Sequence, residues 1–337
     1  MNVHYLNWRP NRLPGTKDEF SDFNLLTMIV SSLKMRSYGH RTKLYCDSYT
    51  VHKMEELHLS DVWNILDGES LDQQIDSAIY NTSSFFNIGK FFILDMESAP
   101  CMLMDTDLIL WENPHEFLDQ AALFTHWEAV WPYTEWYCQK ESLHLPDGYS
   151  LKKTWDFRLP AANTSIMYFK YDRLKNYYCR EALKFLRHNF FTSKFINSEL
   201  LFVEQRLFLM CLQEMQALKF TKPLIDIVWN PAKGYFTSKH PNCSWWNFYL
   251  PDPSEHITHT WISKKAMERN QKYRNYYCCR LLEEIQKLSP GILLQLEKIQ
   301  TFDSFFSLLH RYGDIPSIIE SGSATDILYP SSPFRTY

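Results

Sequence analysis

Short apolar runs alternate with amphipathic stretches along the first half of the chain, a pattern typical of strand–helix units. The predicted strands are residues 3–6, 43–47, 62–66, 101–105, 165–169 and 224–228. The predicted helices are residues 24–35, 51–58, 84–94, 171–188 and 198–215, and the pattern is helical again from residue 264 onward. This order of elements predicts an α/β fold followed by a helical segment.

Glycine is scarce, and its spacing excludes several enzyme classes. The chain has 9 glycines in 337 residues, and no two of them are closer than nine positions. The phosphate-binding loops of dinucleotide oxidoreductases and P-loop NTPases, and the nucleophile elbow of α/β-hydrolases, need glycines closer together than that. These three classes are therefore excluded. The formal net charge of −4 also argues against a nucleic-acid partner.

The cysteines and the N-terminal residues predict a protein of the reducing cytoplasm. None of the 8 cysteines forms a C-x-x-C pair, which favours buried thiols over a zinc site or a disulfide framework. No apolar stretch has the form of a signal peptide or reaches the ~20 residues of a membrane span. We therefore expect a cytoplasmic chain without a transmembrane segment, for which peripheral contact with a membrane stays open.

Two aspartates interrupt the most apolar segment of the chain. Asp105 and Asp107 flank Thr106 directly after the predicted strand at residues 101–105. In an extended chain positions i and i+2 face the same way, so the two carboxylates are expected to point together. A hard divalent cation would relieve their repulsion and leave positions open for phosphate oxygens. A surface turn between two strands is the alternative interpretation.

With this motif the chain resembles a GT-A-fold glycosyltransferase of the D-x-D type, similar to glycogenin-like and capsular-polysaccharide enzymes. Motifs in the family's order carry the resemblance over roughly residues 1–265, namely a strand ending at Asp47, a helix with Lys90, the D-x-D, Asn163-Thr164-Ser165, Glu204-Gln205 and His259 to Lys265. The family usually has glycine at the positions of Ser165 and Ile262. The resemblance implies a single GT-A-like, Rossmann-like α/β domain at residues 1–262, a C-terminal helical extension at 263–320 and a flexible tail at 321–337.

The resemblance also implies an activity. The chain would transfer a sugar from a nucleoside-diphosphate sugar, with a UDP-sugar favoured, to a hydroxyl of a saccharide or glycolipid, as in polysaccharide biosynthesis. Mn²⁺, or else Mg²⁺, would be held by Asp105, Asp107 and His259, and Asp105 would contact either the ion or the ribose of the donor. Retention of the anomeric configuration is slightly favoured. A non-catalytic saccharide-binding protein on a degenerate transferase fold is the alternative.

Four further residues are candidates for binding the donor, each with a structural alternative. Asp47 would lie near the nucleotide, or else cap a helix. Lys90 would contact a phosphate, or else extend its stem along apolar neighbours. Lys265 and Lys264 would pair with the diphosphate, one of them as a point charge. Their alternative is a solvated basic start to the last helical segment, which is favoured for Lys264.

The candidates for the sugar end of the site are three polar residues and a group of aromatic ones. Asn163 would hold a sugar hydroxyl or the shell of the ion, or else shape a turn. Glu204 and Glu128 would meet the sugar or the acceptor, and for Glu204 stabilisation of a helix N-terminus is the alternative. Two or three of six aromatic residues are expected to line the acceptor cleft: Trp127, Trp131, Tyr133, Trp136, Tyr137 and Trp155.

Overall fold

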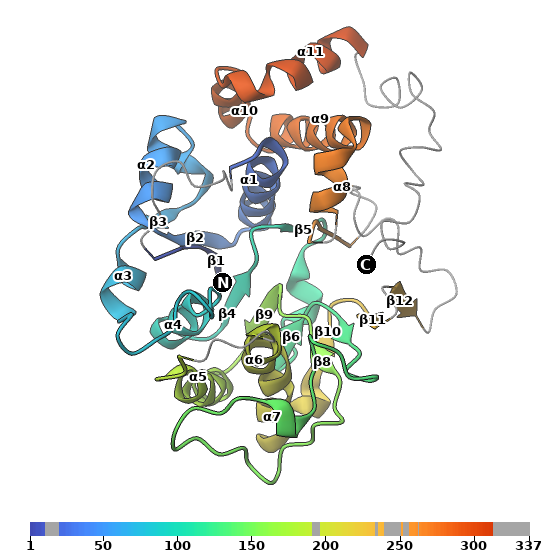
Figure 1. Ribbon diagram of the computed structural model, residues 1–337. Helices are drawn as coiled ribbons and strands as arrows, with labels where there is room; N and C mark the ends of the chain where they lie inside the picture. Colours follow the sequence, from blue (N-terminus) through green and yellow to red (C-terminus); the bar gives the residue numbers. More distant parts are fainter. Residues whose placement is uncertain are drawn as a thin grey trace.

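A mostly parallel sheet runs through the protein, whose computed structural model describes residues 1–10, 20–190, 196–232, 235–238, 251, 256–261 and 263–312. Within these residues the strand order is β10-β6-β9-β4-β1-β2-β3 (Figure 1). The strands are β1 (Asn2–Asn7), β2 (Arg41–Cys46), β3 (Ile65–Asp67), β4 (Cys101–Met104), β6 (Ala122–Phe124), β9 (Ile166–Phe169) and β10 (Thr221–Pro223). Strand β9 runs antiparallel to both β4 and β6, whereas β1 is parallel to β2 and β4.

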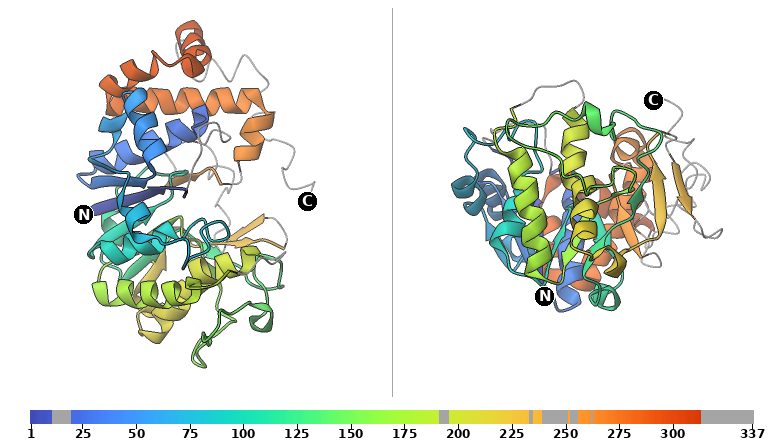
Figure 2. Two further views of the ribbon diagram at one scale, coloured as in Figure 1. Left: turned by 60° about the vertical axis from the view of Figure 1, so that its left-hand side comes forward. Right: turned by 90° about the horizontal axis from the view of Figure 1, so that it is seen from below.

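Helices cover both faces of this sheet (Figures 1 and 2). One face carries α1 (Asp22–Ser37), and α9 (Gln271–Leu288) packs on α1. The other face carries α4 (Gly89–Met96), α5 (Asp172–Leu186) and α7 (Leu207–Glu214). Side chains along β4 point alternately to the two faces of the sheet, so Met102 packs in the core on the α1 side and Leu103 in the core on the α4 side. The parallel strands are therefore apolar on both faces, as the continuous apolar run of β4 predicted.

The remaining helices lie at the ends of these layers. They are α2 (Ser48–Glu56), α3 (Ser70–Gln74), α6 (Ile196–Leu201), α8 (Lys264–Arg269), α10 (Pro290–Leu296) and α11 (Asp303–Tyr312). Helices α8, α10 and α11 each pack against α9. Because α9 shares its apolar core with α1, the C-terminal helices extend the same structural layer.

Two small sheets lie beside the main one. One has the order β12-β11-β7-β8, and the other pairs β13 with β5. Their strands are β5 (Leu108–Leu110), β7 (Trp127–Glu128), β8 (Ala161–Ala162), β11 (Ile227–Asn230), β12 (Tyr235–Ser238) and β13 (Ile257–His259). The antiparallel pairing of β13 with β5 sets His259 opposite Leu108 and so next to Asp107.

The predicted α/β class with helices at its C-terminal end is confirmed by these strands and helices, and three of the differences in element boundaries have a clear local cause. The helix expected at 84–94 begins at Gly89, because the side-chain Oδ1 of Asn81 accepts from the Ser84 amide and forms a turn there. The strand expected at 224–228 begins only at Ile227, as β11, and a separate short strand, β10, ends before it at Pro223.

The third difference lies in the helix expected at residues 198–215. A π-helical turn at Phe202–Arg206 separates α6 from α7. Such a wide turn is common at functional sites and changes the direction of the side chains within it. The predicted tail at 321–337 and Ile262 lie outside the described residues.

The described residues include no membrane-spanning helix and no disulfide bond. No helix in these ranges is long and apolar enough to cross a bilayer. The cysteines described in the structure are free thiols, and all of them except the half-buried Cys138 are buried. They pack as small apolar side chains.

Candidate active site

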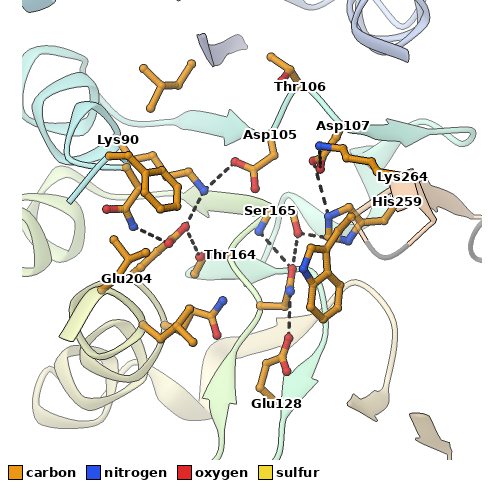
Figure 3. Close-up of a pocket in the computed structure, with 18 of the residues that line it drawn as sticks. Lys90, Asp105, Thr106, Asp107, Glu128, Thr164, Ser165, Glu204, His259 and Lys264 are labelled. Carbon is orange, nitrogen blue, oxygen red and sulfur yellow. Dashed lines mark hydrogen bonds and ion pairs between the residues drawn. The ribbon is translucent and has the colours of Figure 1, made fainter. Parts of the chain in front are cut away.

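A pocket of about 590 Å³ opens where the parallel strands β1 and β4 end (Figure 3). Its lining includes residues just after β1, the start of α4, the turn after β4 and the π-helical turn. Ligands of open α/β sheets bind at this carboxyl edge. The pocket brings together most of the residues predicted from the sequence: Lys90, Asp105, Asp107, Glu128, Asn163, Glu204 and His259.

Lys90 is the centre of one charged cluster. Its Nζ lies 2.6 Å from Asp105 Oδ1 and 2.6 Å from Glu204 Oε1. Glu204 also accepts from Asn87 Nδ2 at 2.5 Å and from Thr164 Oγ1 at 3.0 Å. Both oxygens of Glu204 are therefore held by donors, and its side chain is buried. Lys90 is a buried cation between two carboxylates. The alternative in which Lys90 only packs its aliphatic stem against apolar neighbours does not explain these two ion pairs.

The charges in this cluster depend on one another. Burial lowers the pKa of the Lys90 ammonium, but Asp105 and Glu204 outweigh burial and raise that pKa above its ordinary value. Burial raises the pKa of Asp105, Lys90 opposes this, and the like charge of Asp107 adds to it, so the net pKa is raised. Lys90 thus stays charged at neutral pH and is the counter-ion that Asp105 needs.

Asp107 belongs to a second cluster on the other side of the motif. Lys264 Nζ lies 2.8 Å from its Oδ2, and His259 Nε2 lies 3.6 Å from its Oδ1. Burial acts to raise the pKa of Asp107, but Lys264 and His259 outweigh it and hold that pKa far below its ordinary value. Asp107 is therefore an anion under any ordinary condition, whereas its neighbour Asp105 is paired elsewhere.

A chain of polar side chains connects the sugar-side candidates to His259. Ser165 donates its hydroxyl to Asn163 Oδ1, and the same hydroxyl lies 3.5 Å from His259 Nδ1. Because the hydroxyl proton is directed to Asn163, the hydroxyl accepts from Nδ1–H of the imidazole. Nε2 of the same ring faces Asp107 Oδ1 at 3.6 Å. Ser165 and Asp107 thus hold the two ring nitrogens of His259 from opposite sides.

The positions of Asp105, Asp107 and His259 show which of them could bind a divalent cation. A carboxylate oxygen and an imidazole nitrogen that face each other are ligand types that a divalent cation binds, provided that the nitrogen gives up its proton to the solvent. Asp107 and His259 meet that requirement, whereas the third predicted ligand, Asp105, is directed to Lys90. In the described part of the chain no three His, Cys, Asp or Glu groups converge closely enough to hold a metal by themselves. Two protein donors suit a cation whose other ligands come from a bound diphosphate.

Glu128 lies deeper in the pocket and is not a charged group at neutral pH. Asn163 Nδ2 donates to its Oε1 at 3.0 Å, and His126 Nδ1 lies 3.9 Å from the same oxygen. Burial raises the pKa of Glu128 to about 8, against the hydrogen bond from Asn163. Burial also lowers the pKa of His126 to about 3, so its imidazole is neutral. At pH 7 the pair is a neutral acid beside a neutral imidazole.

We expect Glu128→Gln to stabilise the protein at neutral pH. The pKa of this carboxyl is raised to about 8 in the fold from an ordinary value of 4.5. Between these two pH values the native state keeps a proton that the unfolded state releases. The free energy of unfolding of the wild type therefore falls as pH rises through that window. The amide keeps the shape without the titration, and at pH 7 it should add up to about 3 kcal/mol. Urea unfolding between pH 5 and pH 8 measures this.

The control for this comparison is Glu55→Gln, which changes an exposed carboxyl on α2. It should follow the wild-type pH dependence throughout. If Glu128→Gln follows it as well, Glu128 is ionised in the native protein and the neutral pair does not exist.

Two predicted residues do not line the pocket. Asp47 is the N-cap of α2, where it accepts from the amides of Thr50 and Arg9 at 2.8 and 3.0 Å. Its carboxylate therefore has the role given as its structural alternative, although the chain segment that it holds, at Arg9, lines the pocket. Lys265 is exposed and does not line the pocket, whereas its neighbour Lys264 does.

The lining also includes residues that sequence reasoning left out. Asn87 precedes Lys90 by three positions, a spacing that brings two side chains to one side of a helical turn and could have revealed it. Gln205, which the sequence placed in a motif without a role of its own, accepts a hydrogen bond from the Tyr137 hydroxyl. Nothing in the sequence marks Trp229, whose ring packs edge-on against Trp261 at 5.5 Å.

The aromatic residues at the mouth of the pocket come from three segments. Trp136 and Tyr137 are the members of the predicted group of six that line it. Phe86 and Trp261 join them, and the exposed fractions of Phe86, Trp136 and Trp261 are 62%, 42% and 41%. Rings this exposed beside a pocket are accessible to a ligand.

Comparison with known proteins gives only distant likenesses. No family model matches the chain, and no curated protein matches it in sequence. Among solved structures it is similar to mouse xyloside xylosyltransferase 1 in the apo form, with 11% identity over 78% of this chain and 99% of that chain and a TM-score of 0.38. It is also similar to PaToxG glycosyltransferase, with 12% identity over 65% and 72% of the two chains and a TM-score of 0.29. Both similar structures are named as enzymes that transfer sugars. At 11% and 12% identity neither of them assigns a reaction to this chain.

Proposed function

We propose that this protein is a glycosyltransferase that takes a sugar from a nucleoside-diphosphate sugar, with UDP favoured, and transfers it to a hydroxyl of a saccharide or glycolipid. The observation that carries the proposal is the division of the pocket into two polar ends. Asp107, His259 and Lys264 form one end. Amide and carboxyl groups of Asn163 and Glu128 form the other. This division suits a ligand with a charged diphosphate and a neutral, hydroxyl-rich sugar.

At the diphosphate end, Asp107 and His259 are the residues that would hold Mn²⁺ or Mg²⁺, with Asp105 nearby. The cation, when bound, supplies positive charge that stabilises the departing diphosphate. Lys90 and Lys264 add two ammonium groups to the same region. Both ammonium groups are paired with carboxylates in the empty protein, so a bound cation together with them would supply the positive charge that a departing diphosphate needs.

The sugar end supports retention of configuration. Inversion needs a carboxylate base free to take the acceptor proton. Glu204 has both oxygens engaged by Asn87, Lys90 and Thr164, and Glu128 carries its proton at neutral pH because burial raises its pKa to about 8. Glu204 thus acts as a positioning carboxylate that holds Lys90, and Asn163 and Gln205 offer amide groups to the sugar.

The acceptor would enter past the exposed rings of Phe86, Trp136 and Trp261. Aromatic faces stack on the C–H faces of sugars and exclude water from the contact. Three rings that line one pocket while staying accessible support a saccharide-bearing acceptor.

The proposal is tested with a panel of nucleotide sugars, with and without Mn²⁺. We expect one donor, most strongly a UDP-sugar, to raise the melting temperature, because a ligand at 100 times its Kd stabilises the folded state by about 2.7 kcal/mol. The same donor should be hydrolysed slowly to the nucleoside diphosphate, and EDTA should abolish the turnover. Release of the diphosphate, followed by chromatography, measures it.

The panel separates the proposal from its alternative. Binding without turnover in the presence of a wide set of acceptors would favour a saccharide-binding protein on a degenerate fold. If no nucleotide sugar shifts the melting temperature, the pocket does not bind a donor and the proposal is wrong.

A further inference from the structure

Lys264, for which the sequence favoured a solvated position over a contact with the diphosphate, contacts a carboxylate of the D-x-D motif. Its Nζ lies 2.8 Å from Oδ2 of Asp107, while His259 Nε2 approaches Oδ1 of the same carboxylate at 3.6 Å. Figure 3 shows both side chains directed at Asp107. A lysine therefore lies on one oxygen of the carboxylate that is best placed to receive a cation.

The backbone fixes this juxtaposition. The Thr260 amide donates to the Asp107 carbonyl at 2.9 Å, and the Lys264 amide donates to the Thr260 carbonyl at 3.0 Å. Strand β13, which ends at His259, is paired with β5, which begins directly after Asp107. Since Asp107, His259 and Lys264 are held by one short hydrogen-bonded unit, their contact follows from the fold and not from a long side chain on the surface.

An ammonium on Asp107 opposes the binding of a free cation. A divalent ion at this carboxylate would have to approach a positive charge that is already paired with it, in a place that is only partly exposed to solvent. A diphosphate removes the obstacle, because its oxygens offer Lys264 a second anionic partner of greater charge. The cation and the diphosphate then each favour the binding of the other.

We propose that Lys264 occupies Asp107 in the empty protein and passes to the diphosphate when the donor binds, which couples cation binding to nucleotide binding. This inference rests on the proposed function and deepens it, because it names the residue that makes the two ligands interdependent. By linkage, the factor by which the nucleotide improves cation affinity equals the factor by which the cation improves nucleotide affinity. The empty protein accordingly takes up free cation poorly and binds the complete donor complex well.

The test measures Mn²⁺ binding by the loss of its free-ion electron paramagnetic resonance signal, with and without UDP. In Lys264→Gln we expect the affinity for Mn²⁺ alone to rise about 5- to 10-fold, as the release of a partly exposed ion pair allows. The improvement that UDP brings to Mn²⁺ affinity should shrink by about the same factor. Lys264→Arg keeps the charge and should retain the wild-type coupling. Lys272→Gln removes an exposed lysine further along the chain and should also behave as the wild type.

The outcomes are distinguishable from failure of the proposed function. If the wild type binds Mn²⁺ and UDP together but Lys264→Gln has unchanged affinity for Mn²⁺ alone, the role of Lys264 is wrong and the donor site stands. Wild-type UDP binding that is indifferent to Mn²⁺ also overturns the coupling. If the wild type binds neither ligand, the donor site itself fails, and the inference fails with it.

Discussion

Asp107→Asn is expected to abolish cation-dependent binding of UDP while leaving the fold intact. The amide removes the charge that faces His259 and Lys264 but keeps the size of the side chain. The backbone carbonyl of Asp107 still accepts from Thr260, so β13 stays joined to β5. Loss of one preorganised electrostatic contact to a leaving group commonly costs about 100- to 1,000-fold in rate, and we expect a loss of that order in transfer. Calorimetry with UDP and Mn²⁺ measures the binding.

The control is Asp95→Asn, which changes an exposed aspartate on α4. It should bind UDP as the wild type does. Should Asp107→Asn also bind UDP with unchanged affinity and Mn²⁺ dependence, the cation site does not include Asp107, and the interpretation of the motif as a surface turn regains support.

Lys90→Met is expected to be the most destabilising single change in the pocket. Lys90 is buried and is the shared partner of Asp105 and Glu204, each at 2.6 Å. Removing one member of a buried charged network leaves its partners uncompensated, which costs about 3–5 kcal/mol. Urea unfolding at pH 7 should show a loss of that size.

A second variant shows whether charge or packing is responsible for this loss. In Lys90→Met/Glu204→Gln the carboxylate that Lys90 neutralised is gone as well, so part of the lost stability should return. A double variant that is as unstable as the sum of the two single ones would mean that the two residues do not interact. Lys90 would then be a packing residue whose stem matters more than its charge.

Much of the sheet could be predicted from local patterns. β1, β2 and β4 coincide with short apolar runs in the sequence, and both faces of β4 are buried, as its continuous apolar composition indicates. The D-x-D motif could be placed at the carboxyl edge because it directly follows such a run. These features depend on residues near each other in the chain, which a sequence displays directly.

The partners within the pocket could not be predicted in the same way. Whether Lys264 or Lys265 reaches Asp107 depends on the turn after β13, because neighbouring residues there point in different directions. Both carboxylate oxygens of Glu204 accept hydrogen bonds, and the donors, Asn87, Lys90 and Thr164, are not all close together in the sequence. Long-range contacts of this kind follow from how layers pack and leave no local pattern.

The π-helical turn at Phe202–Arg206 limits how the length of this chain can vary. Its consecutive side chains serve different partners, since Glu204 reaches Lys90 while Arg206 donates to the carbonyls of Cys138 and Phe157, each at 2.8 Å. Deleting one residue would restore a regular helix and rotate one side of it by about 100° relative to the other. One of the two sets of contacts would then be lost, so insertions and deletions are expected to accumulate in surface loops and to spare this turn.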